Sequence, residues 1–166
     1  MTEFGATDDL PTLRRIARLS DDHMVGWLEW HYCTCSDPTT QAEGNDQALV
    51  KNPNKAPRGK NVKWRKLRVL ERPYPQAIAG TPTGFGYRRH SHAFHLRYST
   101  RAPGGGRLPR GVTTRVYVPR RDYPHGYHVA TNGARVISSP NARRLVLRRL
   151  AGSQKITVRL TRPAAP

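Results

Sequence analysis

The sequence predicts a mostly irregular, extended chain with little hydrophobic core of its own, a short N-terminal helix and a small C-terminal α+β module containing a β-hairpin, one helix and one strand. Three observations support this prediction. Hydrophobic residues make up 36 % of the 166 residues, below the roughly 45–50 % of ordinary globular domains. Fourteen prolines and fourteen glycines interrupt regular elements. Regular strand-like patterns are concentrated in the last third of the chain.

An amphipathic helix is predicted over residues 9–20, DLPTLRRIARLS. Leu10, Leu13 and Ile16 lie roughly along one side of this segment, with arginines elsewhere. We expect the helix to be a packing element, although an arginine-bearing helix near an N-terminus is also typical of a mitochondrial targeting segment. Residues 36–66 show no periodicity and are predicted to be a surface linker.

The last third of the chain carries the regular patterns. β-Branched residues favour strands in VTTRVYV and in HVATNGARVI, where Asn132-Gly133 suits a type I′ turn. Ser139 can cap a helix that stops at Gly152, and KITVRL alternates as a half-buried strand does. The expected module is a strand at 112–118, a hairpin at 128–137, a helix at 141–150 and a strand at 155–160.

Three segments are therefore expected along the chain. Residues 1–23 form an N-terminal helix and arm, residues 24–95 an extended segment, and residues 96–166 a basic, β-rich module. The net charge is +18, and from Arg72 to the C-terminus the only acid is Asp122. Such a field attracts polyanions, namely RNA, anionic lipid or acidic protein surfaces. No run approaches the about 18–20 apolar residues of a membrane span, and no secretory signal is visible.

Catalytic and metal sites are not expected. His31, Cys33 and Cys35 are of the types that bind zinc, but no recognisable spacing supplies a fourth ligand, so we predict no metal and no cofactor. Cysteines at i and i+2 point to opposite faces of a strand and are not expected to bridge. His90 and His92 would share a strand face, where neighbouring arginines lower their pKa. With one acid beyond residue 71, no Ser-His-Asp arrangement is available.

Two segments resemble a known family. WLEWHYCTCSDPTT, residues 27–40, resembles the W-x-x-W-L-H-…-D-x-P-P-T signature of the complex I accessory subunit family called NADH dehydrogenase 1 alpha subcomplex subunit 12. PYPQAIAGTPTGFGYRR, residues 73–89, is similar to that family's H-x-P-N-x-T-G-T-x-x-x-Y-x-P. A tryptophan lies between the two segments, where the family also tends to carry one. The resemblance implies subunit-interface contacts for nine residues, which are Trp27, Trp30, His31, Pro38, Trp64, Gly80, Thr81, Pro82 and Tyr87.

The resemblance implies a non-catalytic accessory or assembly subunit of mitochondrial respiratory complex I, NADH:ubiquinone oxidoreductase, on the matrix side of the inner membrane. It implies that these residues contact other subunits of a large hetero-oligomeric complex, with inner-membrane lipid headgroups as a further contact. A tryptophan pair on an extended chain supplies large apolar anchors. The alternative is a mitochondrial ribosomal protein whose basic tail binds rRNA. An enzyme is not expected.

Overall fold

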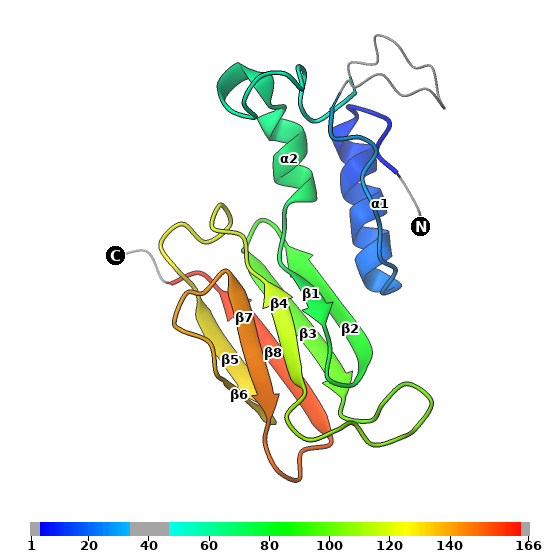
Figure 1. Ribbon diagram of the computed structural model, residues 1–166, viewed down its shortest axis with the longest axis vertical. Helices are drawn as coiled ribbons and strands as arrows, with labels where there is room; N and C mark the ends of the chain where they lie inside the picture. The colour runs from blue at the N-terminus through cyan, green and yellow to red at the C-terminus, as the bar shows by residue number, and fades with distance from the viewer. Residues whose placement is uncertain (1–3, 34–46, 164–166) are drawn as a thin grey trace. The chain divides into compact units, whose positions relative to one another are not determined.

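The computed structural model describes residues 4–33 and 47–163 (Figure 1). The chain divides into two compact units. The first combines the residues up to Ser20 with Val25–Glu71, and the second combines Asp21–Met24 with the chain from Arg72 onward. This division differs from the three segments expected from the sequence. The boundary expected after residue 95 falls inside a single strand, Ala93–Ser99.

The first unit is helical. It contains α1 (Leu10–Asp22, whose last residues belong to the second unit), the 3-10 helix η1 (Gly59–Asn61) and α2 (Trp64–Leu70). The helix predicted at 9–20 is confirmed by α1, and its apolar side packs into a small cluster with Phe4, Val69 and Leu70. Helix α2 was not predicted, since residues 36–66 were interpreted as a linker.

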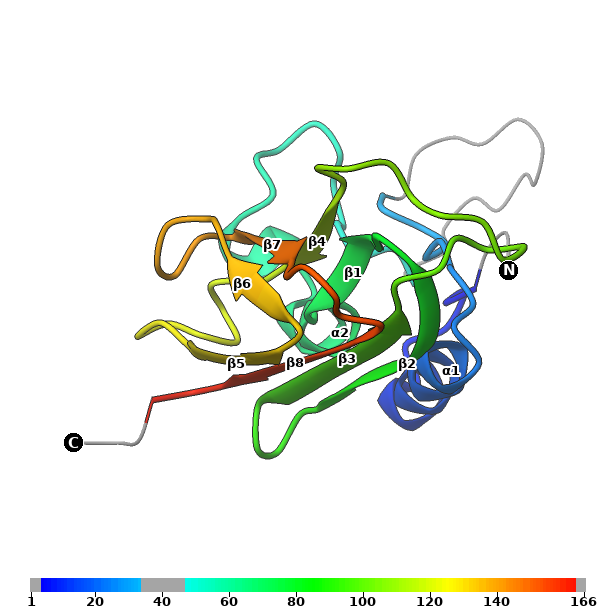
Figure 2. The same ribbon diagram turned by 90° about the horizontal axis from the view of Figure 1, so that it is seen from below.

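The second unit contains two four-stranded antiparallel sheets (Figure 2). The strand order is β1-β4-β7-β6 in one sheet and β2-β3-β8-β5 in the other. Figure 2 shows the two sheets stacked as layers. The strands are β1 (Tyr74–Ala77), β2 (Thr81–Arg88), β3 (Ala93–Ser99), β4 (Thr113–Tyr117), β5 (His128–Asn132), β6 (Ala134–Val136), β7 (Arg144–Arg149) and β8 (Lys155–Thr161).

The hydrophobic core lies between the two sheets. Phe94, Leu96 and Tyr98 alternate along β3 as buried residues, and Leu145 and Leu147 do the same on β7. Alternation of this kind buries one face of a strand and leaves the other polar. A sandwich of two such sheets therefore needs only about half of its strand residues to be apolar, so a low hydrophobic fraction is compatible with a complete core.

The predicted strands at 112–118 and 155–160 are confirmed by β4 and β8, but the predicted hairpin is wrong. Both of its strands form, as β5 and β6, yet β5 pairs with β8 and β6 pairs with β7. The chain passes from one sheet to the other at Gly133, which has φ +76°. A Cβ at this position would lie 2.5 Å from the Lys155 carbonyl oxygen, so Asn132-Gly133 makes a corner between layers instead of a hairpin turn.

The helix predicted at 141–150 is also wrong, because this segment contains β7. Asn141, expected inside the helix, has a left-handed φ of +57°, which ends any helix there. The run RRLVLRR alternates with period two, placing leucines inside and arginines outside. The expectation of a mostly irregular chain with little private core is accordingly corrected to a mostly β domain with two antiparallel four-stranded sheets and two α-helices.

Candidate functional site

Isolated parallel β-bridges, the first of them spanning α1, organise the first unit. Phe4 forms a parallel bridge with Glu29, and the Phe4 N–H donates to the Leu28 carbonyl at 2.9 Å. Helix α1 connects the two bridged segments, as parallel pairing requires a crossover. A second parallel bridge joins Cys33 to Val50. Parallel pairing across a helix is also the building block of α/β barrels, whose functional groups stand at the carboxyl ends of the strands.

Two aspartates after the first bridged segment are engaged locally. The Thr12 N–H donates to Asp9 Oδ2 at 3.0 Å, which makes Asp9 the cap of α1. Hydrogen bonds from Thr12 lower the pKa of Asp9. Asp8 forms an ion pair with Lys63, and the Asp8 side chain is 44 % exposed. Both carboxylates therefore have structural partners at the start of α1.

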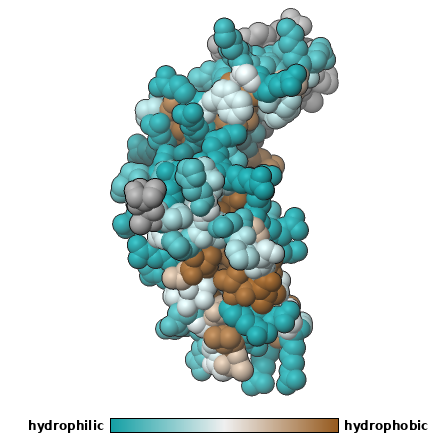
Figure 3. Space-filling model, turned by 90° about the vertical axis from the view of Figure 1, so that its left-hand side faces the viewer, coloured by the Kyte–Doolittle hydropathy of each residue, from teal (hydrophilic) through white to brown (hydrophobic). Residues whose placement is uncertain are grey.

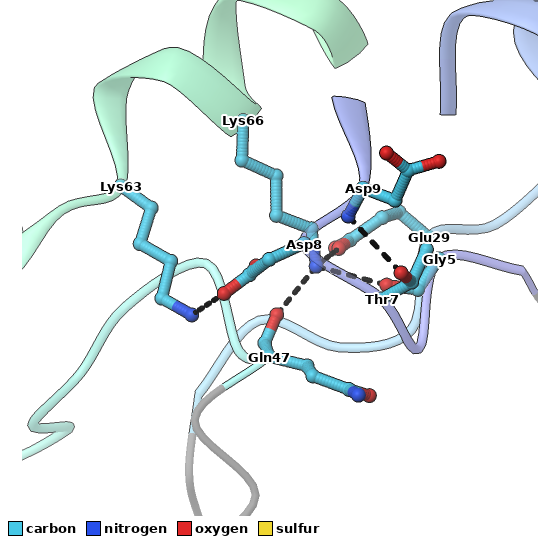
Figure 4. A network of polar contacts seen from close by, with 8 residues as sticks. All are labelled: Gly5, Thr7, Asp8, Asp9, Glu29, Gln47, Lys63 and Lys66. Atoms are coloured by element: carbon cyan, nitrogen blue, oxygen red, sulfur yellow. Dashed lines mark hydrogen bonds and ion pairs between the residues drawn. The ribbon is translucent and has the colours of Figure 1, made fainter. Parts of the chain in front are cut away.

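Lys66 of α2 is the centre of this network (Figure 4). Its Nζ donates to the Gly5 carbonyl at 2.9 Å and to the Gln47 carbonyl, and it lies 2.9 Å from Glu29 Oε1. Two of the ammonium donors thus bind backbone carbonyls, and the contact with Glu29 Oε1 is an ion pair without hydrogen-bond geometry. The Lys66 side chain is only 2 % exposed and that of Glu29 12 %. One buried cation thus joins both bridged segments to the chain at residue 47.

The buried pair has opposing effects on Glu29. Burial raises the pKa of the Glu29 carboxyl, and the contact with the charged Lys66 lowers it in part. A buried carboxylate that is already paired with a lysine acts as a structural tie at the strand end. It is not a group poised to exchange protons with a substrate.

The three predicted tryptophan anchors lie in this unit and contact its own residues. The Trp27 ring meets Phe4 edge to face, with centroids 4.9 Å apart. Trp30 stacks on His31 at 5.3 Å. Trp64 begins α2, and its Nε1 donates to the Gly59 carbonyl at 2.8 Å. All three are half-buried. The predicted interface residue Pro38 lies outside the described residues.

The candidate zinc ligands are not gathered into a cluster. Within residues 4–33 and 47–163, no three His, Cys, Asp or Glu side chains lie together as a metal site would require. Cys35 lies outside these ranges. Cys33 is disulfide-bonded, which contradicts the expectation that the cysteines do not bridge. No helix within the same ranges is long and apolar enough to cross a membrane.

The remaining predicted site residues lie in the second unit, at the start and end of β2. Gly80 is buried, and a Cβ added there would be 1.8 Å from the Ser99 carbonyl oxygen. Thr81 Oγ1 donates to the Arg101 carbonyl at 3.0 Å. Pro82 is half-buried in the same strand. These residues lie where β2 begins to pair with the end of β3. They belong to the second unit, whereas the tryptophans belong to the first.

Tyr87 takes part in a polar cluster. Its hydroxyl lies 2.7 Å from Nδ1 of His92, which sits in the turn between β2 and β3. His92 Nδ1 is in turn 3.7 Å from the buried Asp122. Burial is the largest cause that lowers the pKa of His92, and Arg162 and Arg89 lower it further. The predicted lowering of the pKa by arginines is therefore present at His92. His90 and His92 do not share a strand face, because both lie in the turn between β2 and β3.

The sequence reasoning missed the lysine–glutamate tie. A signal was available, because Lys66 stands three and four residues before Val69 and Leu70, and both of these are buried. Residues at that spacing share one helix face. A helix reading of WRKLRVL would therefore have placed Lys66 on the buried side and raised the question of its partner.

Comparisons with known proteins identify the family. Residues 72–159, nearly the whole sandwich, match the glycoside hydrolase family 5 C-terminal domain. The chain belongs to that family. It is 30 % identical over 169 residues to endoglycoceramidase I of Rhodococcus hoagii, covering 99 % of this chain and 27 % of that protein. It is 37 % identical over 82 residues to a glucosylceramidase of Cryptococcus neoformans, covering 48 % of this chain and 11 % of that protein.

Solved structures agree on the fold. The lactosyl-enzyme intermediate of endo-glycoceramidase II from Rhodococcus sp. superposes with a TM-score of 0.65 at 24 % identity, over 99 % of this chain and 33 % of that one. Sterylglucosidase 1 of Cryptococcus neoformans superposes with a TM-score of 0.70 at 16 % identity, over 93 % of this chain and 24 % of that one. This glycoside hydrolase family 5 C-terminal domain thus spans about a third or less of its relatives.

These findings correct the functional predictions. The resemblance to a complex I accessory subunit is wrong, and the ribosomal alternative is not supported, because the relatives are glycoside hydrolases. The expectation that the chain is not an enzyme but a non-catalytic accessory subunit is contradicted by the same relatives, which are glycoside hydrolases. Mitochondrial localisation is also wrong, since the relatives are bacterial and fungal glycosidases. The two resembling segments are short and rich in Trp, Pro and Gly, which recur in many unrelated folds.

Proposed function

We propose that this chain is part of a glycoside hydrolase that cleaves a sugar from a lipid, with the first unit contributing to a catalytic α/β barrel and the second forming a sandwich domain of the same protein. The observation that carries the proposal is the 99 % coverage of the chain by its match to an endoglycoceramidase. The similarity therefore extends through the first unit as well as the sandwich. An endoglycoceramidase, a glucosylceramidase and a sterylglucosidase share, in their names, a sugar joined to a lipid.

The reaction class follows from one relative. A lactosyl-enzyme intermediate means that the Rhodococcus enzyme passes through a covalent glycosyl-enzyme. Such double displacement uses two carboxyl groups, one as nucleophile and one as acid and then base. In a barrel these groups stand at the carboxyl ends of strands. The proposed reaction is therefore hydrolysis of a glycosidic bond with retention of configuration.

One carboxylate of the first unit is a candidate for this chemistry. Asp8 pairs with Lys63, Asp9 caps α1, and Glu29 pairs with Lys66. Glu3 directly precedes the bridged Phe4 in the sequence and lies outside the described residues. We propose Glu3 as a catalytic carboxylate on the ground of its place in the sequence, because Asp8, Asp9 and Glu29 have structural partners.

A chimaera tests the proposal. Residues 1–166 replace the matching third of Rhodococcus endo-glycoceramidase II, and hydrolysis of detergent-solubilised lactosylceramide is measured. We expect activity, and we expect Glu3→Gln to reduce it by about a hundredfold or more without changing the far-ultraviolet circular dichroism. Asp9→Asn is the matched control, since it removes a carboxylate that only caps a helix. A folded chimaera without hydrolysis, or equal activity losses in the two variants, would refute the proposal.

A further inference from the structure

The two sheets of the sandwich differ in their exposed apolar residues. Within residues 72–163, every exposed large hydrophobic side chain lies on a strand of the β1-β4-β7-β6 sheet or one residue beyond its end. None lies on β2, β3, β5 or β8. Figure 3 faces the side where β5 and β6 lie and shows apolar atoms exposed among hydrophilic ones there. The exposed residues are Tyr74, Val112, Val136, Ile137 and Leu150, at 38–45 % exposure. Val136 is opposite the buried Leu147, so it lies on the inner side of the sheet at its edge and is not part of the outer face.

Arginines lie on the outer face of the β1-β4-β7-β6 sheet, the face that points away from the core. Arg148 of β7 is directly opposite Arg135 of β6, and Arg115 of β4 is opposite Val146. Arg144 is opposite Tyr117. Like charges directly opposite on a sheet destabilise it. No ion pair among residues 4–33 and 47–163 engages Arg115, Arg135, Arg144 or Arg148, so their charge faces outward.

Two tyrosines extend the same face. The rings of Tyr74 and Tyr117 are 5.4 Å apart, and Tyr117 lies in the same row as Arg144. Tyrosine and arginine are amphipathic side chains that place an apolar body in the hydrocarbon boundary and a polar end in the headgroup layer. Exposed Ile137, one residue beyond the edge strand β6, has no polar atoms in its side chain with which to bind a phosphate backbone or an acidic peptide.

We propose that the outer face of the β1-β4-β7-β6 sheet docks on an anionic phospholipid bilayer. The occupant follows from the combination of charge and apolar exposure: unpaired arginines attract anionic headgroups, and the aliphatic and aromatic side chains enter the interface between them. The choice of a membrane rests in part on the proposed function, because a sugar-linked lipid substrate resides in a membrane. The docked sandwich would hold the enzyme at the surface that contains its substrate.

Vesicle co-sedimentation of the full chain tests this docking. The vesicles are phosphatidylcholine alone or with about one third phosphatidylglycerol. The test variant is Arg115→Gln/Arg135→Gln/Arg148→Gln. The control variant, Arg97→Gln/Lys155→Gln/Arg159→Gln, removes the same charge from exposed positions on the other sheet's outer face. Circular dichroism confirms that both variants fold.

We expect binding to the anionic vesicles, an affinity loss of about a hundredfold in the test variant, and a much smaller loss in the control. Ile137→Asn should weaken the binding that persists at high salt, because that fraction is apolar. Equal losses in both triple variants would overturn the proposal, since binding would then follow net charge alone. Binding of a short RNA in place of vesicles, abolished by the test variant, would also overturn it.

The test is independent of the hydrolase proposal. The chimaera is assayed on detergent-solubilised substrate, which needs no docking face. An active chimaera with no vesicle binding would refute only the docking, and vesicle binding by the full chain with an inactive chimaera would refute only the hydrolase.

Discussion

Replacing Lys66 by Met should lower the stability of the first unit much more than replacing Lys63 by Met. Methionine keeps an unbranched stem of similar length but removes the ammonium group. The Gly5 and Gln47 carbonyls then lose their donor, and the buried Glu29 carboxylate loses its counter-charge. Lys63 has a single exposed partner, Asp8. The two lysines stand three residues apart at the start of α2, so they form a matched pair.

The expected magnitudes follow from burial. The Lys66 and Glu29 side chains are 2 % and 12 % exposed, and breaking a buried ion pair costs about 3–5 kcal/mol, because one charge remains buried and unpaired. The Lys63–Asp8 pair has an aspartate that is 44 % exposed. An exposed pair of this kind contributes about 0–1 kcal/mol. Lys66→Met should therefore lower the free energy of unfolding by several times the effect of Lys63→Met.

The assay uses the position of the tryptophans. All three, at 27, 30 and 64, belong to the first unit, and the second unit contains none. Tryptophan fluorescence during urea unfolding of the full chain therefore reports on the first unit. At a slope of about 1–3 kcal/mol per molar urea, a loss of about 3–5 kcal/mol lowers the Lys66→Met midpoint by about 1–5 M. Amide hydrogen exchange in the strands of the sandwich is the internal control and should be unchanged.

The pH dependence gives a second signature. Burial already raises the pKa of Glu29, and Lys66 opposes that rise. Without Lys66 the folded pKa rises further, so the folded variant favours the protonated carboxyl. A raised pKa gives stability below the unfolded value, near 4.5, that is lost as the pH increases through the folded pKa. The Lys66→Met loss should therefore be larger at neutral pH than near pH 4. A loss that is independent of pH, or equal to that of Lys63→Met, would refute the reasoning.

Three further predictions concern the sandwich. Gly80→Ala should destabilise it by about 2 kcal/mol or more in thermal unfolding, because its Cβ would overlap a backbone carbonyl, whereas Gly106→Ala meets nothing within 4 Å and should be nearly neutral. Burial, followed by two nearby arginines, lowers the pKa of His95. The wild-type sandwich should thus lose stability as the pH falls below about 6.5, and a shallower pH dependence in His95→Gln would support this origin. Phe94→Ala should cost about 3–5 kcal/mol by calorimetry, since Phe94 is fully buried.

Local patterns in the sequence predicted some elements and missed others for physical reasons. The spacing of Leu10, Leu13 and Ile16 predicted α1, and the alternation in KITVRL predicted β8. The same alternation in RRLVLRR was read as a helix because Ser139 and Gly152 mimic helix caps. Asn132-Gly133 carried a correct local signal, a positive φ at Gly133. Its partners, however, are set by tertiary pairing that no local pattern contains.

The candidate site was harder to predict from the sequence than the fold. The bridged segments around Phe4 and Glu29 are too short to show a period, and their pairing is parallel and crosses a helix. The importance of Lys66 depends on oxygens 61 and 19 residues away along the chain. Short motifs, by contrast, were over-interpreted, because the Trp27 to Trp30 spacing is satisfied here by packing within the first unit.

Net charge says little about the fold and more about partners. The excess of +18 predicts a field that attracts polyanions. In the sandwich, arginines such as Arg115, Arg148 and Arg159 occupy alternate strand positions that face outward. At such exposed positions water screens the charge and lowers its cost, although the directly opposed Arg135 and Arg148 still repel each other. The single acid of this region, Asp122, is buried, so it does not neutralise the surface. The period-two pattern therefore determines the core, and the charge that remains outside determines which surface an anionic partner meets.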